Sequence, residues 1–220
     1  MSNRRVYAIQ KGPKGYMWFL THDGIDRYNG KEFKQYKLLD GEEEINSMMN
    51  LNWLYSDSQG RLWEIGKQGR VFCYESKHDR FQLTYKLPKS ETEGLHTPVS
   101  YGFVDDNNTI WLCNQRNIYL YDSDTKKTVT IKNEINESIT DIEQIDATHY
   151  FIGTDVGVHY AELKNDILAL SPCEKLDTLR FKSTSFSFIK AAAKSSSELF
   201  KGGFMYTTST FTRHFMSSRV

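Results

Sequence analysis

Short segments in which apolar and polar residues alternate cover most of the first 172 residues. Residues 6–9 and 51–55 are typical, with an apolar or aromatic side chain at every second position. Clusters of Asp, Asn and Gly separate these segments. Short alternating segments bounded by turn residues are typical of half-buried β-strands. The pattern therefore predicts an all-β fold.

A pair of aromatic positions recurs along the chain. The first position is occupied in turn by Trp18, Trp63, Trp111 and Phe151, which are 45, 48 and 40 residues apart. The second position follows its partner after 10, 11, 10 and 9 residues, at Tyr28, Tyr74, Tyr121 and Tyr160. Two coupled positions held through four copies indicate an internal repeat. We interpret these eight residues as structural blade anchors that fill the space between neighbouring sheets.

Each repeat contains four predicted strands in about 45 residues, which is typical of a β-propeller blade. We expect blades at about residues 6–37, 51–87, 99–133 and 139–172, within a propeller region of residues 1–182. We expect residues 183–220 to form an incomplete fifth blade or a disordered or aberrant tail, because the repeat fades there and 14 of these 38 residues are Ser or Thr. A seven-bladed ring needs about 315 residues. We therefore expect four to five blades in an open arc, whose exposed apolar faces favour a homodimer.

Charge and cysteine content exclude several classes of protein. Lys and Arg total 28 and Asp and Glu total 28, so no net positive charge favours nucleic-acid binding. No apolar stretch is long enough for a transmembrane helix, and the N-terminus lacks the apolar segment of a secretory signal. Taken as it stands, the chain would remain cytoplasmic. Its three cysteines, Cys73, Cys113 and Cys173, form no C-x-x-C pair. We expect inert buried thiols.

Residues 15–30, GYMWFLTHDGIDRYNG, carry a family resemblance. Together with the strand at residues 2–9, they resemble the first repeat of two-component regulator propellers, the periplasmic sensor region of Bacteroides-type hybrid two-component systems. The resemblance covers residues 2–160 well and 161–206 weakly. The chain departs from the pattern at Leu20 and Cys113, which replace Gly, at Glu64, which replaces an apolar residue, and at Phe151, which replaces Trp.

This resemblance implies a periplasmic sensor that recognises oligosaccharides and, within the full protein, regulates glycan-utilisation genes. The partners implied are an oligosaccharide and the remainder of the sensor. A protein-interaction scaffold is the alternative, followed by a propeller glycoside hydrolase or lyase.

The loops between the second and third strands of each blade are the expected ligand-binding positions, because a propeller gathers them at one rim. Asp23, Gln68, Arg116 and Asp155 occupy these loops, and Trp53 on an innermost strand could stack against a sugar ring. Ordinary solvated turns are the alternative interpretation of the same residues.

Other chemistry has weaker support. Asp23, Asp26 and Asp155 are the loop carboxylates that a glycosidase could use, yet no nucleophile motif accompanies them. The six histidines are scattered, and residues 105–108 lack the Gly and Glu of an EF-hand loop. The acidic residues 42–44 are expected on a solvated face. We therefore expect no catalysis, no cofactor and no metal.

Overall fold

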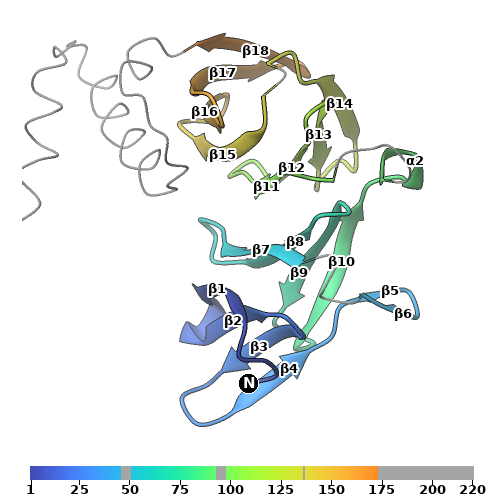
Figure 1. Cartoon of the computed structure of the whole chain (residues 1–220), viewed down its shortest axis with the longest axis vertical. Helices are drawn as coiled ribbons and strands as arrows, with labels where there is room; N and C mark the ends of the chain where they lie inside the picture. The colour runs from blue at the N-terminus through green and yellow to red at the C-terminus, as the bar shows by residue number, and fades with distance from the viewer. Residues whose placement is uncertain (46–50, 93–97, 136, 173–220) are drawn as a thin grey trace, which may run out of the picture. The chain divides into compact units, whose positions relative to one another are not determined.

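The computed structural model describes residues 1–45, 51–92, 98–135 and 137–172. It divides into two compact units, Met1–Asn136 and Glu137–Val220. The described residues contain four four-stranded antiparallel sheets, each with its strands in sequence order (Figure 1). The predicted all-β fold of four-stranded propeller blades is confirmed. Cys173 and the expected fifth blade or tail at residues 183–220 lie outside the described residues, and the open arc stays a prediction.

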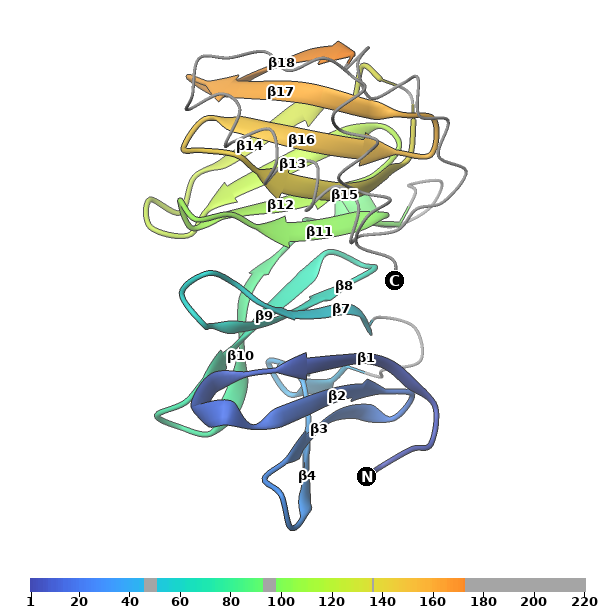
Figure 2. The same ribbon diagram turned by 90° about the vertical axis from the view of Figure 1, so that its left-hand side faces the viewer.

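Three blades belong to the first unit. The first blade consists of β1 (Val6–Lys11), β2 (Met17–Thr21), β3 (Gly24–Tyr28) and β4 (Phe33–Tyr36). The second consists of β7 (Leu51–Ser56), β8 (Leu62–Gly66), β9 (Arg70–Glu75) and β10 (Arg80–Lys86). The third consists of β11 (Tyr101–Val104), β12 (Thr109–Cys113), β13 (Asn117–Asp122) and β14 (Thr128–Lys132). Figure 2 shows these sheets following one another along the unit.

The second unit contains the fourth blade, and short elements connect the blades of the first. The fourth blade consists of β15 (Ile139–Gln144), β16 (His149–Thr154), β17 (Val158–Lys164) and β18 (Ile167–Pro172). A small hairpin of β5 (Leu39–Asp40) and β6 (Glu43–Glu44) connects the first two blades. One helical turn, α2 (Lys89–Thr92), follows the second blade, and a 3-10 turn, Pro13–Gly15, lies between β1 and β2.

The turn between the first and second strands has the same five-residue form in all four blades. Its first backbone N–H donates to the carbonyl of its fifth residue, as from Asp57 to Arg61 and from Asp105 to Thr109. The fourth residue of the second-blade turn is Gly60, with a φ of 75° that favours glycine. The carboxylates of Asp57 and Asp105 also accept a hydrogen bond from the indole N–H six residues later, at 2.8 Å from Trp63 and at 3.0 Å from Trp111. One Asp thus fixes the turn and orients the blade's tryptophan.

The first and fourth blades lack this aspartate. The equivalent first-blade position is Gly12, and a Cβ there would lie 2.5 Å from the Trp18 ring. The Trp18 ring fills the space that an aspartate would need, and its buried indole N–H has no acceptor. In the fourth blade the equivalent position is Ile145, whose N–H still closes the turn onto His149.

Aromatic residues of neighbouring blades pack against one another in the first unit. Trp18 of the first blade meets Tyr74 of the second edge to face, with ring centroids 4.6 Å apart. Trp63 of the second blade shares a core with Tyr121 of the third. The tryptophan therefore faces the next blade, and the tyrosine faces the preceding one, because the two are offset by one residue in register.

Two predicted anchor tyrosines differ from this scheme. Tyr28 is only half-buried and stacks on Phe33, because no described blade precedes the first. Tyr160 pairs directly with Phe151, so both lie on one face of the sheet. The shorter spacing of 9 residues moves the tyrosine by one position and therefore to the other face. Ala161, which is fully buried, occupies the position equivalent to Tyr74 and Tyr121.

Candidate functional site

The two ends of the blades are distinct in the first unit. At one end the five-residue turns of neighbouring blades interact, since the Ser56 hydroxyl donates to the Lys11 carbonyl and the Ser58 hydroxyl donates to Asp106. The loops between second and third strands lie at the opposite end of each sheet. The first-blade, second-blade and third-blade loops, which carry Asp23, Gln68 and Arg116, therefore lie at the same end of the first unit.

The segments that follow the second and third blades, and the one that precedes the third, form backbone hydrogen bonds with these loops. In the second blade, Leu87 N–H donates to the Gly69 carbonyl at 3.0 Å, and Val99 N–H donates to the Lys67 carbonyl at 2.9 Å. In the third blade, Asn133 N–H donates to the Arg116 carbonyl at 2.7 Å. Backbone groups that are paired in this way limit the movement of the loops, so the side chains are presented from a rigid frame.

A polar side chain at the start of the loop fixes its conformation in three blades. The Thr21 hydroxyl donates to the Gly24 carbonyl at 3.0 Å in the first blade. Asn114 accepts from two backbone N–H groups in the third, including that of Arg116 at 2.8 Å. The Thr154 hydroxyl donates to the Gly157 carbonyl at 3.0 Å in the fourth. These side chains are structural parts of the loops rather than exposed ligand contacts.

Three of the four predicted rim side chains already have protein partners. Asp23 accepts a hydrogen bond from the Asn3 amide at 2.9 Å. Gln68 accepts from Arg70 at 2.8 Å. Asp155 accepts from the backbone N–H of Ser138 at 3.0 Å. A ligand can still share these exposed oxygens, because a carboxylate or amide oxygen accepts more than one hydrogen bond.

Arg116 is exposed at the tip of the third-blade loop. Its backbone N–H and carbonyl are both hydrogen-bonded, whereas its guanidinium joins no ion pair with any residue that the structure describes. The side chain therefore presents its donors to solvent from a fixed backbone. No hydrogen bond or ion pair joins it to Asp23 or Gln68 in the described part of the first unit. The structure thus brings three predicted residues to one end without linking them directly.

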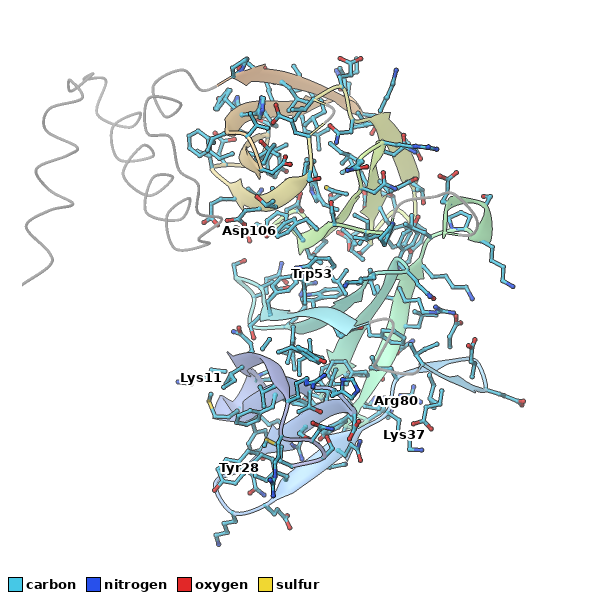
Figure 3. All side chains as sticks on the ribbon, in the orientation of Figure 1. Lys11, Tyr28, Lys37, Trp53, Arg80 and Asp106 are labelled. Carbon is cyan, nitrogen blue, oxygen red and sulfur yellow. The ribbon has the colours of Figure 1, made fainter. Side chains whose placement is uncertain are left out.

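Trp53 lies on β7, between the second and third blades (Figure 3). It is half-buried, and its ring meets the Tyr101 ring at a centroid distance of 6.1 Å and an interplanar angle of 68°. The ring thus contributes to the core between these blades and keeps only part of its surface exposed. We retain its role in stacking against a sugar as a proposal.

The remaining candidate residues lie in structural rather than ligand-binding environments. Asp26 is buried, and it accepts hydrogen bonds from the backbone N–H and hydroxyl of Ser2, both at 2.7 Å. Asp105 serves its turn and Trp111, and no group of three or more potential metal ligands occurs among the described residues. Cys113 is buried and Cys73 is half-buried. Burial raises the pKa of the Cys73 thiol to about 11 and also raises that of Cys113, which disfavours the reactive thiolate near neutral pH.

A polar cluster surrounds Asp79, at the turn between β9 and β10, and the sequence did not predict it. Its carboxylate accepts from Arg27 at 2.7 Å and from Lys34, Tyr36 and Tyr74, each at 2.6 Å. Three of these donors come from the first blade and one from the second. The cluster therefore joins the two blades at their outer edge. A lone Asp in a turn carries no signal for such a role, because its partners lie 43 to 52 residues away, apart from the nearby Tyr74.

Comparison with known proteins shows the fold. No family model matches the sequence, and no curated protein matches it. The extracellular domain of a hybrid two component system from B. thetaiotaomicron matches with a TM-score of 0.57 and 18% identity, over 80% of this chain and 26% of that one. Virginiamycin B lyase from Staphylococcus aureus matches with a TM-score of 0.55 and 13% identity, over 78% of this chain and 57% of that one.

These matches bear on fold and on length. The chain spans about a quarter of the sensor domain and just over half of the lyase. Within the described residues no helix is both long and apolar enough to cross a membrane. The chain is an array of propeller-type blades similar in fold to the extracellular domain of a B. thetaiotaomicron hybrid two component system.

Proposed function

We propose that this chain is part of the periplasmic sensor region of a hybrid two-component system, and that it binds an oligosaccharide without catalysis. The observation that carries the proposal is the common end of the first unit, where rigid loops present Asp23, Gln68 and Arg116. The motif resemblance at residues 15–30 and the fold of the sensor domain support the same class of protein. Signalling needs the remainder of the sensor.

The chemistry of the loops suits a polyhydroxylated ligand. Sugar hydroxyls need both donors and acceptors, and the three residues supply a carboxylate, an amide and a guanidinium. Arg116 is the strongest candidate among them, because its guanidinium donors are exposed while its backbone is fixed. A hydrogen bond to a charged group contributes about 1.5–3 kcal/mol.

The test is binding of a glycan library, followed by calorimetry on each oligosaccharide that binds. Arg116→Ala should weaken binding tenfold or more, since 1.4 kcal/mol corresponds to a factor of ten. Arg80→Ala is the matched control, because Arg80 is an exposed arginine at the start of β10, away from the loops. Arg80→Ala should bind like the parent, and both variants should unfold at the parent's temperature.

Three outcomes would contradict the proposal. Equal binding by the parent and Arg116→Ala would show that the ligand site was wrongly assigned to these loops. Turnover of a bound oligosaccharide would show that the site is catalytic. A protein partner recovered in the absence of any glycan binding would favour the interaction scaffold.

A further inference from the structure

Glu64 occupies a position of β8 that belongs to the apolar core between the first and second blades. It pairs in register with Leu54 of β7 and with Phe72 of β9. Both neighbours belong to the core cluster that also contains Trp18 and Leu20 of the first blade. Residues directly opposite in an antiparallel sheet share a face. The Glu64 side chain therefore points toward the first blade.

The carboxyl group of Glu64 is isolated from water and from hydrogen-bond partners. The residue has no exposed surface, and both carboxyl oxygens are buried without a partner. Burial of this kind raises the pKa of Glu64 well above its ordinary value of 4.5. An ionised carboxylate without a partner in an apolar core costs far more free energy than the neutral acid.

The charged and titratable groups that face this core have partners other than Glu64. Arg27, Lys34, Tyr36, Tyr74 and Asp79 bond to one another at the outer edge of the core. Tyr16, which also packs against the core, lies beneath the Arg27 guanidinium. Arg70 of β9 donates to Asp40 and Gln68. None of these groups donates to Glu64, so no cation in the described residues compensates a negative charge there.

We propose that Glu64 is a pH-sensitive element of the contact between the first and second blades. As the neutral acid it packs as an uncharged side chain in their shared core. When the O–H proton leaves to solvent, the carboxylate has to be hydrated, and the first blade separates from the second. This inference goes beyond the proposed ligand binding and does not depend on it.

The sign of the pH dependence follows from proton linkage. In the unfolded chain Glu64 loses its proton near its ordinary pKa of 4.5, whereas burial raises the pKa of Glu64 in the folded chain, which therefore holds the proton to higher pH. The unfolded or opened form therefore binds fewer protons, and the folded form loses stability as pH rises. The equilibrium constant for opening should increase by up to tenfold per pH unit until the folded-state carboxyl itself ionises.

The experiment compares the parent with Glu64→Gln, which keeps the shape of the side chain and cannot ionise. Thermal midpoints are measured from pH 5 to pH 9 in the full chain. The parent should lose stability with rising pH relative to Glu64→Gln. Glu42→Gln is the matched control, because Glu42 is exposed in the turn between β5 and β6, and its curve should follow that of the parent.

A second variant and a second measurement keep the proposal testable if Glu64→Gln fails to fold. Glu64→Leu also cannot ionise and should be more stable than the parent above pH 7. Infrared spectra at neutral pH should show a protonated-carboxyl band in the parent that both variants lack. Hydrogen exchange of the backbone amides in β2 and β8 should accelerate with pH beyond its intrinsic pH dependence, and only in the parent. Parallel stability curves, or no protonated-carboxyl band, would overturn the proposal.

Discussion

Replacing Asp105 with Ala should destabilise the third blade strongly. The Asp105 side chain accepts from the Trp111 indole N–H at 3.0 Å and from the backbone N–H groups of Asn107 and Thr109 at 2.9 and 2.8 Å. The indole N–H is fully buried, so loss of its acceptor costs about 1–3 kcal/mol. The two backbone bonds contribute about 0.5–1.5 kcal/mol each, which brings the expected loss to about 2–6 kcal/mol.

The measurement is urea unfolding followed by tryptophan fluorescence. Asp106→Ala is the matched control, because Asp106 is the exposed neighbour in the same turn. It loses only the solvent-exposed bond from Ser58 and should change stability by less than about 1 kcal/mol. Asp105→Asn should lie between the two, since its amide oxygen still accepts from the turn. If Asp105→Ala and Asp106→Ala have the same effect, the hydrogen bonds to Asp105 do not stabilise the blade and the reasoning is wrong.

Two further predictions concern ionisable side chains in the same unit. Burial opposes ionisation of Asp79, but hydrogen bonds from Lys34, Tyr36 and Tyr74 and the charge of Arg27 hold its pKa below 3.8. The contribution of this carboxylate to folding stability is therefore present above pH 3.8 and is lost as the pH falls below it. Asp79→Asn should therefore cost about 1–2 kcal/mol at pH 7, because the carboxylate is 38% exposed, and should flatten the acid limb of a stability curve from pH 6 to pH 2. In a Cys173→Ser background, a thiol reagent at pH 7.5 should label Cys73 and Cys113 only after denaturant is added, because burial raises the pKa of both thiols. Rapid labelling of the folded chain would contradict this prediction.

The periodic part of the fold could be predicted from the sequence. Strand alternation and the spacing of Trp18, Trp63 and Trp111 depend on local pattern and burial, which a single sequence displays. Register is harder to predict, because one residue more or less in a loop moves a side chain to the opposite face. That is why Tyr160 was expected at a position that Ala161 occupies.

The candidate site was predictable only as far as its loops. The turn residues indicate where the second-to-third strand loops lie, and therefore which side chains they carry. The hydrogen bonds from Asn3 to Asp23 and from Arg70 to Gln68 depend on side-chain geometry that spacing does not encode. The Asp79 cluster likewise depends on donors brought together by the packing of two blades.

The contact between the first two blades contains several irregular features. Gly12 replaces the aspartate that bonds the tryptophan in the next two blades, so the Trp18 N–H is left without an acceptor. Glu64 adds an unpartnered carboxyl to the same core. Asp79, with donors from both blades, stabilises the outer edge of the same contact. Buried groups without partners weaken a core, whereas charge-assisted bonds at its edge strengthen it. The apolar core and the Asp79 cluster together hold the first blade against the second, and on our proposal the protonation of Glu64 inside that core sets how stable this packing is at a given pH.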